Sequence, residues 1–539
     1  MQNMTLLLGS AQKIVTEQVD KWIIIDDVDT LVIPLDALPR KYSLRQLNDG
    51  LAQLPVSSQV EKAAKAAIIE CCLQGHKRLS LKEEDPADTQ RLIVWLLETM
   101  RPEGARFFDP SSDSANSAEI EKARAEWRFT SIFALRSIKL LISYDMVPET
   151  DTMSEVLLGL LAFTQLSDTW NSKPAYRISM DALNCQPQEV FTEAFTVNYV
   201  LKRFLRPLFA TSTPPAITPQ GRKAPNENLG NRIAEASSIP DPISKPWKFR
   251  DIHSVTVFRW VVNRADEDLI SRNWHLFIPP LMTLLDDPTT SVRASGLTIL
   301  SEFLKKTSHR MLVQTGLSNL LEEALMPTLS FLPTLTPVTE SQLLLQKAYA
   351  ALLALGDIRY SSDDNRPERN RFYDRLIREG VFYGIDHCRD VTVILVLLLA
   401  EMSKIIDRLQ IYSIKHIKDI LPLLSAVLID PFAPSNPGLL LQGIKTLQTT
   451  ILNCWPILSE EYHRVQIVKT LSVCWINLTR DILHNGSEDE KHGFDQLKQE
   501  LQISASLLCR STGEIAGQER DLMGVANIYP ELSNLFKIE

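Results

Sequence analysis

The chain has 539 residues, of which 45% are hydrophobic, and its 57 basic and 66 acidic residues give a formal net charge of −9. This length exceeds what one compact core needs and indicates two or more domains or an array of repeats. The acidic balance gives no electrostatic reason to expect nucleic-acid binding. Only 19 glycines are present, so tight hairpin turns must be few, which favours helices over sheets.

Neither a signal peptide nor a membrane-spanning helix is predicted. The N-terminal sequence MQNMTLLLGSAQKIV has no basic region ahead of its short apolar run. The longest nearly apolar run, VTVILVLLLA at 391–400, has about half the length that a bilayer span requires. Seven cysteines are spread over the chain without a CxxC motif, which favours unpaired thiols in a reducing compartment.

The N-terminal part of the chain, residues 1–208, predicts a block of helices. The stretch SQVEKAAKAAIIECCLQG begins with Ser58 and Glu61 in the spacing of a capping box and ends on Gly75. Short β-branched runs at 20–40 match no element clearly. Further apolar periodicities predict helices at 88–101, 117–144, 152–166 and 187–210.

A proline-rich segment separates this block from the rest of the chain. Residues 211–249 contain seven prolines and little that could form a core, which is typical of a linker or a long loop. We therefore divide the chain into an N-terminal helical block at 1–208, a proline-rich linker or loop at 209–249 and a C-terminal repeat array at 250–539.

Three similar stretches in the C-terminal part indicate a repeat. They are PPLMTLLDDP at 279–288, MPTLSFLPTLTP at 326–337 and LPLLSAVLIDP at 421–431, each with a proline ahead of an apolar run. A second predicted helix follows each of them, at 291–304, 341–355 and 438–452. The string LLLQ occurs at 343–346 and again at 439–442, a shift of 96 residues.

Two further helix pairs complete the pattern, one at 371–385 and 390–402, the other beginning near Glu460 and ending with 494–508. A helix pair that recurs about every 40 to 50 residues is typical of a HEAT-like solenoid. The sequence therefore predicts an all-α fold, a HEAT-like helical-repeat solenoid of the armadillo type, preceded by the N-terminal helical block.

The prolines of this array have predicted structural roles. Asp287-Pro288 and Thr336-Pro337 would each place a capping side chain before a proline at the first helical position, where no amide donor is needed. Pro280, Pro327 and Pro422 would lie early in the first helix of a pair, or kink it.

Candidate sites are few, and structural explanations are favoured for most of them. None of the nucleotide-binding, nucleophile-elbow or zinc-protease motifs occurs, so an enzyme is not expected, and no cofactor or metal is predicted. His387-Cys388 could begin a metal site, but packing is favoured because no second Cys or His lies near in sequence. Ser487 precedes an acidic run and is a possible phosphosite, although a solvated loop is favoured.

An acid–arginine pair and a glycine have a predicted role in packing. Asp286 or Asp287 with Arg293 resembles the turn acid and second-helix arginine of HEAT units, and an ion pair that holds the stack is the favoured interpretation. Gly296 is expected where two helices approach closely, so a larger side chain there, as in Gly296→Leu, would overpack the interface.

The run that begins at Trp274 and continues to residue 356 resembles the Tel-two-interacting protein two family, in which a similar string lies within a helical-repeat region. The resemblance covers about 80 residues. It is carried by Thr315, Gly316, Leu317, Ala324, Leu325, Pro327, Pro333, Leu335, Thr336, Pro337 and Tyr349.

The resemblance implies a non-enzymatic scaffold subunit of the Triple T co-chaperone complex. Its partners would be the Tel-two protein and the larger Tel-two-interacting protein one. With the ninety-kilodalton heat-shock chaperone, the complex would mature phosphatidylinositol-kinase-related kinases (PIKKs) of the mTOR, ATM and ATR classes, which act in TOR and DNA damage signalling. The implied compartments are cytoplasm and nucleus.

Two alternatives stay open from the sequence. Periodicity alone allows a HEAT-repeat adaptor of another assembly, for example in nuclear transport or phosphatase scaffolding. An enzyme with a site in the N-terminal block would need titratable residues that converge in a cleft.

Overall fold

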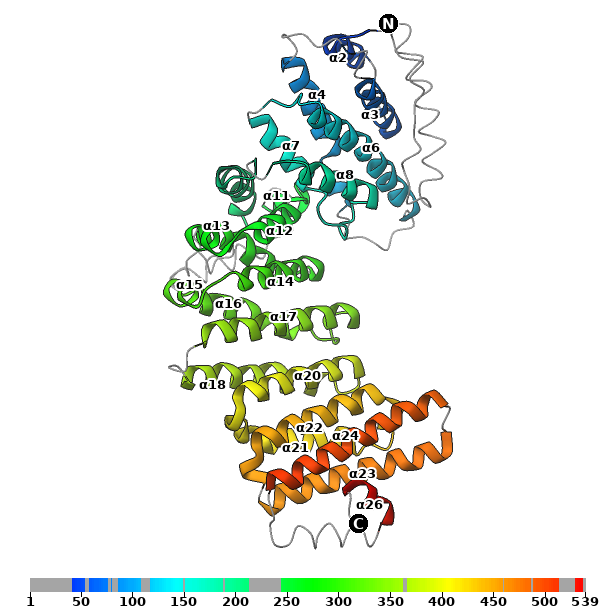
Figure 1. Ribbon diagram of the computed structural model, residues 1–539, viewed down its shortest axis with the longest axis vertical. Coiled ribbons are helices and arrows are strands. Elements are labelled where there is room, and N and C mark those ends of the chain that lie inside the picture. Colours follow the sequence, from blue (N-terminus) through cyan, green and yellow to red (C-terminus); the bar gives the residue numbers. More distant parts are fainter. Residues whose placement is uncertain are drawn as a thin grey trace. The chain divides into compact units, whose positions relative to one another are not determined.

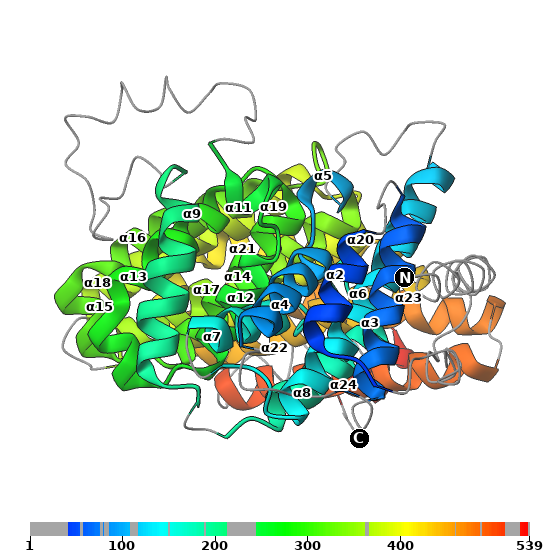
Figure 2. The same ribbon diagram turned by 90° about the horizontal axis from the view of Figure 1, so that it is seen from above.

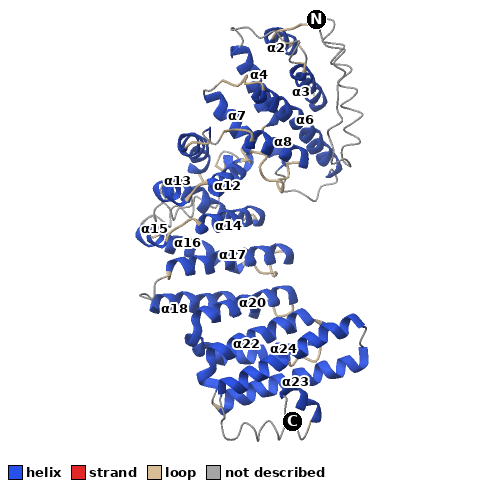
Figure 3. Ribbon diagram, in the orientation of Figure 1, coloured by secondary structure: helices blue, strands red, loops and turns tan. Residues whose placement is uncertain are grey.

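A computed structural model describes residues 41–53, 58–75, 79, 86–107, 117–148, 151–187, 190–212, 244–361, 366–458, 460–485, 488–512 and 529–536. The regular structure of these residues is helical, and they form no sheet (Figure 3). A single backbone bridge joins Tyr42 to Leu79. Within this part of the chain no helix is long and apolar enough to cross a membrane. The predicted all-α repeat fold is confirmed.

The chain divides into two compact units, Met1–Leu284 and Leu285–Glu539. Helix α12 (Ser254–Arg264) packs against α7 (Asp151–Leu161) and against η4 (Ala194–Leu205), so it belongs to the first unit although it follows the proline-rich segment. The domain boundaries drawn from the sequence at 208 and 249 stay a prediction.

The first unit is built around one long helix, α6 (Ser117–Ser143), which packs against α3, α4 and α8 (Figure 2). The Trp127 indole is fully buried there, edge-on to Phe107 at 5.1 Å and stacked on Phe163 at 6.3 Å between ring centroids. The remaining elements are α2 (Leu44–Ala52), α3 (Gln59–Gln74), α4 (Pro86–Met100), α5 (Gly104–Phe107), α8 (Lys173–Asn184), α9 (Arg206–Ala210), α11 (Pro246–Phe249) and most of α13 (Glu267–Asp286).

The predicted start of α3 is confirmed in detail. The Ser58 hydroxyl accepts a hydrogen bond from the Glu61 amide at 3.2 Å, and the Glu61 carboxylate accepts one from the Ser58 amide at 3.1 Å. Gly75 caps the other end. The helix predicted at 187–210 begins later, as the π-helix η4, and α8 was not predicted.

The second unit is a stack of helix pairs. Its second helices follow one another in the order α14, α17, α20, α22 and α24 (Figure 1), and each packs against the next. The elements are α14 (Thr290–Lys305), α15 (His309–Thr315), α16 (Leu317–Leu325), η6 (Met326–Ser330), α17 (Val338–Arg359), α18 (Arg366–Arg375), η8 (Leu376–Phe382), α19 (Tyr383–His387), α20 (Thr392–Leu409), η9 (Gln410–His416), α21 (Ile417–Leu428), η10 (Ala433–Ser435), α22 (Pro437–Leu458), α23 (Glu461–Asn485), α24 (Glu488–Thr512), η11 (Pro530–Leu532) and α26 (Ser533–Phe536).

Polar contacts between equivalent positions of successive second helices fix their alignment. Lys347 donates to Thr298 at 2.8 Å across 49 residues, and Arg408 donates to Asp357 at 2.6 Å across 51. The hydroxyls of Ser403 and Thr449 are 2.8 Å apart across 46. The steps of 51 residues from α17 to α20 and of 46 residues from α20 to α22 add up to 97 residues, within one residue of the 96-residue LLLQ shift. The repeat inferred from the sequence is therefore a physical one.

The role predicted for the 326–337 stretch is wrong. Pro327 lies in the first turn of η6, a short 3-10 helix that follows α16, and Pro333 lies in a turn beyond it. The first helix of this pair is formed by α15 and α16 instead. The prolines thus shape the connection between α16 and α17, where helix is not required.

The predicted proline caps are also displaced. Pro337 is itself the N-cap of α17, so Thr336 precedes the cap. Thr289 is the N-cap of α14, and the Asp287 carboxylate accepts from the Thr289 amide at 3.0 Å instead of capping the helix. Pro280 and Pro422 do lie within α13 and α21, but neither lies in the first turn: Pro280 is in the second half of α13, whose break from helical geometry is at Asn273, and Pro422 is near the middle of α21.

We predict that Gly316→Ala destabilises the second unit. Gly316 joins α15 to α16 with φ of +71°, a conformation that costs a residue with a Cβ about 1–2 kcal/mol, although nothing crowds the site. Gly438→Ala is the control, because Gly438 has open space and no positive φ. Thermal unfolding should show a lower Tm for the first variant alone. Equal Tm values would contradict a strained turn.

Candidate interaction surface

Arg293 links neighbouring helix pairs of the second unit. From α14 its Nε donates to the Asp287 backbone carbonyl at 3.1 Å, and its Nη1 donates to the Thr328 hydroxyl in η6 at 3.1 Å. The guanidinium lies 4.6 Å from the centre of the Phe331 ring. Arg293 thus joins neighbouring helix pairs, but its hydrogen bond with Asp287 runs through the backbone, and the ion pair expected from the sequence stays a prediction.

Burial lowers the pKa of Arg293, while the charges of Asp286 and Asp287 act in the opposite direction. The buried guanidinium thus has hydrogen-bond acceptors, an aromatic face and negative charge around it. These are the conditions under which a buried cation is tolerated. Arg293 therefore ties the α16–α17 connection to α14.

Tyr349 lies in the core between α17 and η8. Its ring approaches Gly380 so closely that a Cβ at position 380 would lie 2.8 Å from the Tyr349 hydroxyl and 2.9 Å from Leu329 Cδ1. Burial raises the pKa of Tyr349, and the charge of Glu401 adds to the effect. Tyr349 therefore has a packing role, and Gly380 permits it.

The other residues singled out from the sequence are scattered. Gly296 is buried in α14, and Trp274 is half-buried in α13. The Thr315 hydroxyl donates to the Met311 carbonyl at 2.6 Å. Ser487 lies outside the described residues. These positions do not converge on a site, and a functional role for them stays a prediction.

The described residues contain no group of three or more side chains able to hold a metal ion. The Nδ1 atom of His387 lies 2.8 Å from the Tyr383 backbone carbonyl, and the His387 ring contacts the tilted Tyr383 ring at 4.1 Å between centroids. Cys388 is buried. The pair is explained by local packing, as favoured from the sequence.

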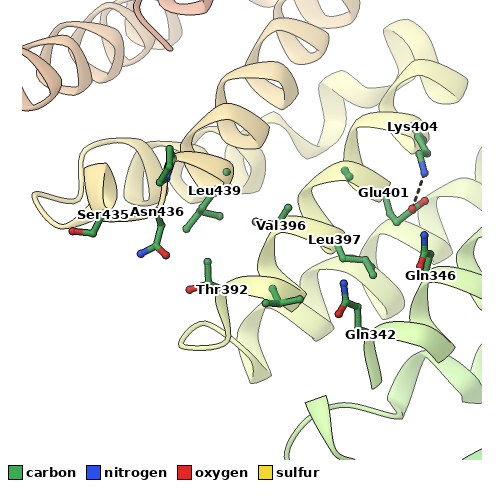
Figure 4. A pocket seen from close by; sticks show the side chains of 14 residues that line it. Gln342, Gln346, Thr392, Val396, Leu397, Glu401, Lys404, Ser435, Asn436 and Leu439 are labelled. Atoms are coloured by element: carbon green, nitrogen blue, oxygen red, sulfur yellow. Dashed lines mark hydrogen bonds and ion pairs between the residues drawn. The ribbon is translucent and has the colours of Figure 1, made fainter. Parts of the chain in front are cut away.

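A groove runs along α20 between α17 and the start of α22, and we call it the α20 groove (Figure 4). Its volume is about 520 Å³. Its floor is the α20 stripe from Thr392 to Lys404, and its walls are Gln342 and Gln346 of α17 on one side and residues 435–439 on the other. Val396, Leu397 and Leu439 supply apolar surface between polar ends.

The charges of the α20 groove are layered. The Glu401 carboxylate is 5% exposed and accepts from the Lys404 ammonium at 2.7 Å, whereas the Lys404 side chain is 53% exposed. The Lys404 ammonium is therefore the member of this ion pair that faces the solvent at the end of the groove. The Gln342 and Gln346 side-chain amides are exposed and make no hydrogen bond to another described residue.

A second feature is a set of exposed apolar side chains on η9, α22 and α24, which we call the C-terminal apolar patch. Leu452 is 58% and Trp455 53% exposed, and their spacing places them on one face of α22. The patch is completed by Ile411, Tyr412 and Ile503.

Inter-helix contacts bring these side chains to one region. Ser413 of η9 contacts Cys454 Sγ at 3.1 Å, which places Ile411 and Tyr412 at the same end of α22 as Trp455. Gln448 donates to Glu500 at 2.8 Å, so Ile503 lies beside the turn that carries Leu452. Exposed aromatic and aliphatic side chains on neighbouring helices are typical of protein-binding surfaces.

The patch was not predicted from the sequence. Leu452 and Trp455 belong to the same apolar pattern as the buried residues of α22, such as Ile451 and Cys454. An apolar periodicity does not tell which side chains the neighbouring helices leave uncovered. Only the alignment of α22 with α24 shows it.

The fold and these surfaces define a class of protein: an all-α solenoid whose groove and apolar patch suit protein binding. The sequence model of the Tti2 family matches residues 156–435, just over half of the chain. The chain belongs to the Tti2 family. The match extends on both sides beyond the 274–356 stretch that carries the resemblance seen in the sequence.

A comparison with solved structures matches the "Crystal complex of SYS-1/POP-1 at 2.5A resolution". The alignment covers 91% of this chain and 92% of that chain at 11% sequence identity, with a TM-score of 0.25. A score this low supports no argument about fold or function.

We predict that Arg293→Lys destabilises the second unit by about 2 kcal/mol, because lysine cannot donate to Asp287 and Thr328 together while lying flat on Phe331. Arg389→Lys is the control, since Arg389 is exposed and pairs with Asp386 three residues before it. Urea unfolding followed by circular dichroism measures both variants. Unchanged unfolding of Arg293→Lys would contradict the link.

Proposed function

We propose that this protein is a non-enzymatic scaffold subunit of the Triple T co-chaperone complex. The observation that carries the proposal is the match of residues 156–435 to the Tti2 family. The helical stack supports it, because stacked repeats offer long surfaces to other proteins more often than closed catalytic pockets.

In this function the chain works by presenting a surface. We propose that it contacts the larger Tel-two-interacting protein one directly and assembles with the Tel-two protein. Together with the ninety-kilodalton heat-shock chaperone, the complex would stabilise newly made phosphatidylinositol-kinase-related kinases. Cytoplasm and nucleus are the proposed compartments.

Within the chain, we assign the main partner contact to the second unit and, in it, to the C-terminal apolar patch. Another solenoid can bury Trp455 and Leu452 under its own helix faces. Trp and Tyr side chains in such positions carry a large share of binding energy in protein interfaces.

Affinity purification of the full-length chain from cells, followed by mass spectrometry, tests the complex. The expected co-purifying proteins are the Tel-two protein, Tel-two-interacting protein one, large phosphatidylinositol-kinase-related kinases and chaperone components. Depletion of the protein should lower the steady-state level of those kinases. Recovery of transport cargo or phosphatase subunits in their place would favour another HEAT-type adaptor.

The location of the contact is tested by the double variant Leu452→Ala and Trp455→Ala. Loss of two exposed anchors should weaken co-purification of Tel-two-interacting protein one at least tenfold without changing thermal stability. Leu166→Ala, which removes an exposed leucine of the first unit, is the control. Full binding by the double variant, or loss in the control, would contradict this placement.

A further inference from the structure

We propose that the α20 groove binds an extended peptide segment that carries an acidic side chain about four residues from an apolar one. The site goes beyond the proposed scaffold function, and its ligand is a short linear segment of another protein. The inference stands on the groove's shape, on its unused amides and on the exposed cation at one end.

The amides of the groove indicate that the segment is extended. Gln342 and Gln346 are one helical turn apart on α17 and line the same wall, and Asn436 faces them across the floor (Figure 4). Each side-chain amide has both donors and an acceptor. A helix has already paired its own main-chain groups, whereas an extended segment leaves N–H and C=O groups available to such amides.

The charge of the groove selects an acidic side chain. Lys404 presents its ammonium at the groove end, and Glu401 orients it from below with one short contact of 2.7 Å. A lysine ammonium has three donors, so donors are left for an incoming carboxylate. The Glu401 carboxylate is buried beneath the exposed Lys404 ammonium, so an incoming ligand meets the positive charge of Lys404 first.

The spacing follows from helix geometry. Lys404 lies eight residues beyond Val396, which at 1.5 Å per residue is about 12 Å along α20. An extended chain advances about 3.3 Å per residue, so four residues cover this distance. Side chains four apart in an extended segment lie on the same side. An apolar side chain over Val396 and an acidic one at Lys404 can therefore bind together.

The test uses the purified full-length chain and fluorescein-labelled peptides with the core Leu-Ser-Ala-Ser-Glu, in both chain directions, within a Gly/Ser frame. Matched peptides carry Gln or Lys in place of Glu. Fluorescence anisotropy should show that one Glu peptide binds with a Kd of about 0.1 mM. The Gln peptide should bind about tenfold more weakly, and the Lys peptide more weakly still.

Variants then assign the contacts. Lys404→Gln should make the Glu and Gln peptides bind alike. Lys305→Gln is the matched control, because Lys305 pairs with Glu302 three residues away at the same 2.7 Å but lies on α14, outside the groove. The double variant Gln342→Ala and Gln346→Ala should weaken every peptide by a similar factor while the preference for Glu persists.

Three results would overturn the proposal: no binding of either Glu peptide up to about 0.5 mM protein, equal binding of the Lys and Glu peptides, or an unchanged preference in Lys404→Gln. Because the measurement uses the chain alone, it is independent of whether the protein assembles with the Triple T subunits. Failure here would leave the scaffold proposal standing.

Discussion

The second unit depends on the burial of each helix pair against the next one. Helix α20 shows why: Leu398, Leu399, Met402, Ile405 and Ile406 are all fully buried, which no isolated helix pair could achieve. Burying an aliphatic side chain is worth roughly 1.5–3 kcal/mol, so the apolar faces hold the stack together. Such burial has no direction, however, and the alignment along the helix axes needs another source.

Polar contacts supply that alignment. Asn453 donates to Asp407 at 3.0 Å, and the Thr446 hydroxyl donates to the Leu399 carbonyl at 3.1 Å. Each bond contributes only about 1 kcal/mol, but a slip of one helical turn would break all of them at once. Arg293 does the same for the irregular connection after α16. Alignment by polar contacts and cohesion by apolar burial are thus separate tasks of different residues.

Much of this architecture could be predicted from local sequence. The capping box at Ser58 and Glu61 and the recurrent LLLQ string follow from short-range rules, and the structure confirms both. The errors arose where proline was taken as a helix start. Pro327 and Pro337 bracket a connection whose apolar residues, such as Leu329 and Leu332, are buried under tertiary contacts without being α-helical. The spacing of apolar residues does not distinguish those that pack a helix face from those that are buried in an irregular connection. The groove and the patch were beyond prediction because they exist only between helices far apart in sequence.

The two surfaces of the second unit share one support without overlapping. Leu439 lines the α20 groove near the start of α22, and Leu452 begins the C-terminal apolar patch 13 residues later, about 20 Å along the same helix. A protein on the patch therefore leaves the groove open to a peptide. Both surfaces also depend on the alignment of α20 with α22. The contact between Ser403 and Thr449, near the middle of α22, helps to hold this alignment. A shift of that alignment would move a wall of the groove and a part of the patch together. Binding at one surface can therefore change the geometry of the other.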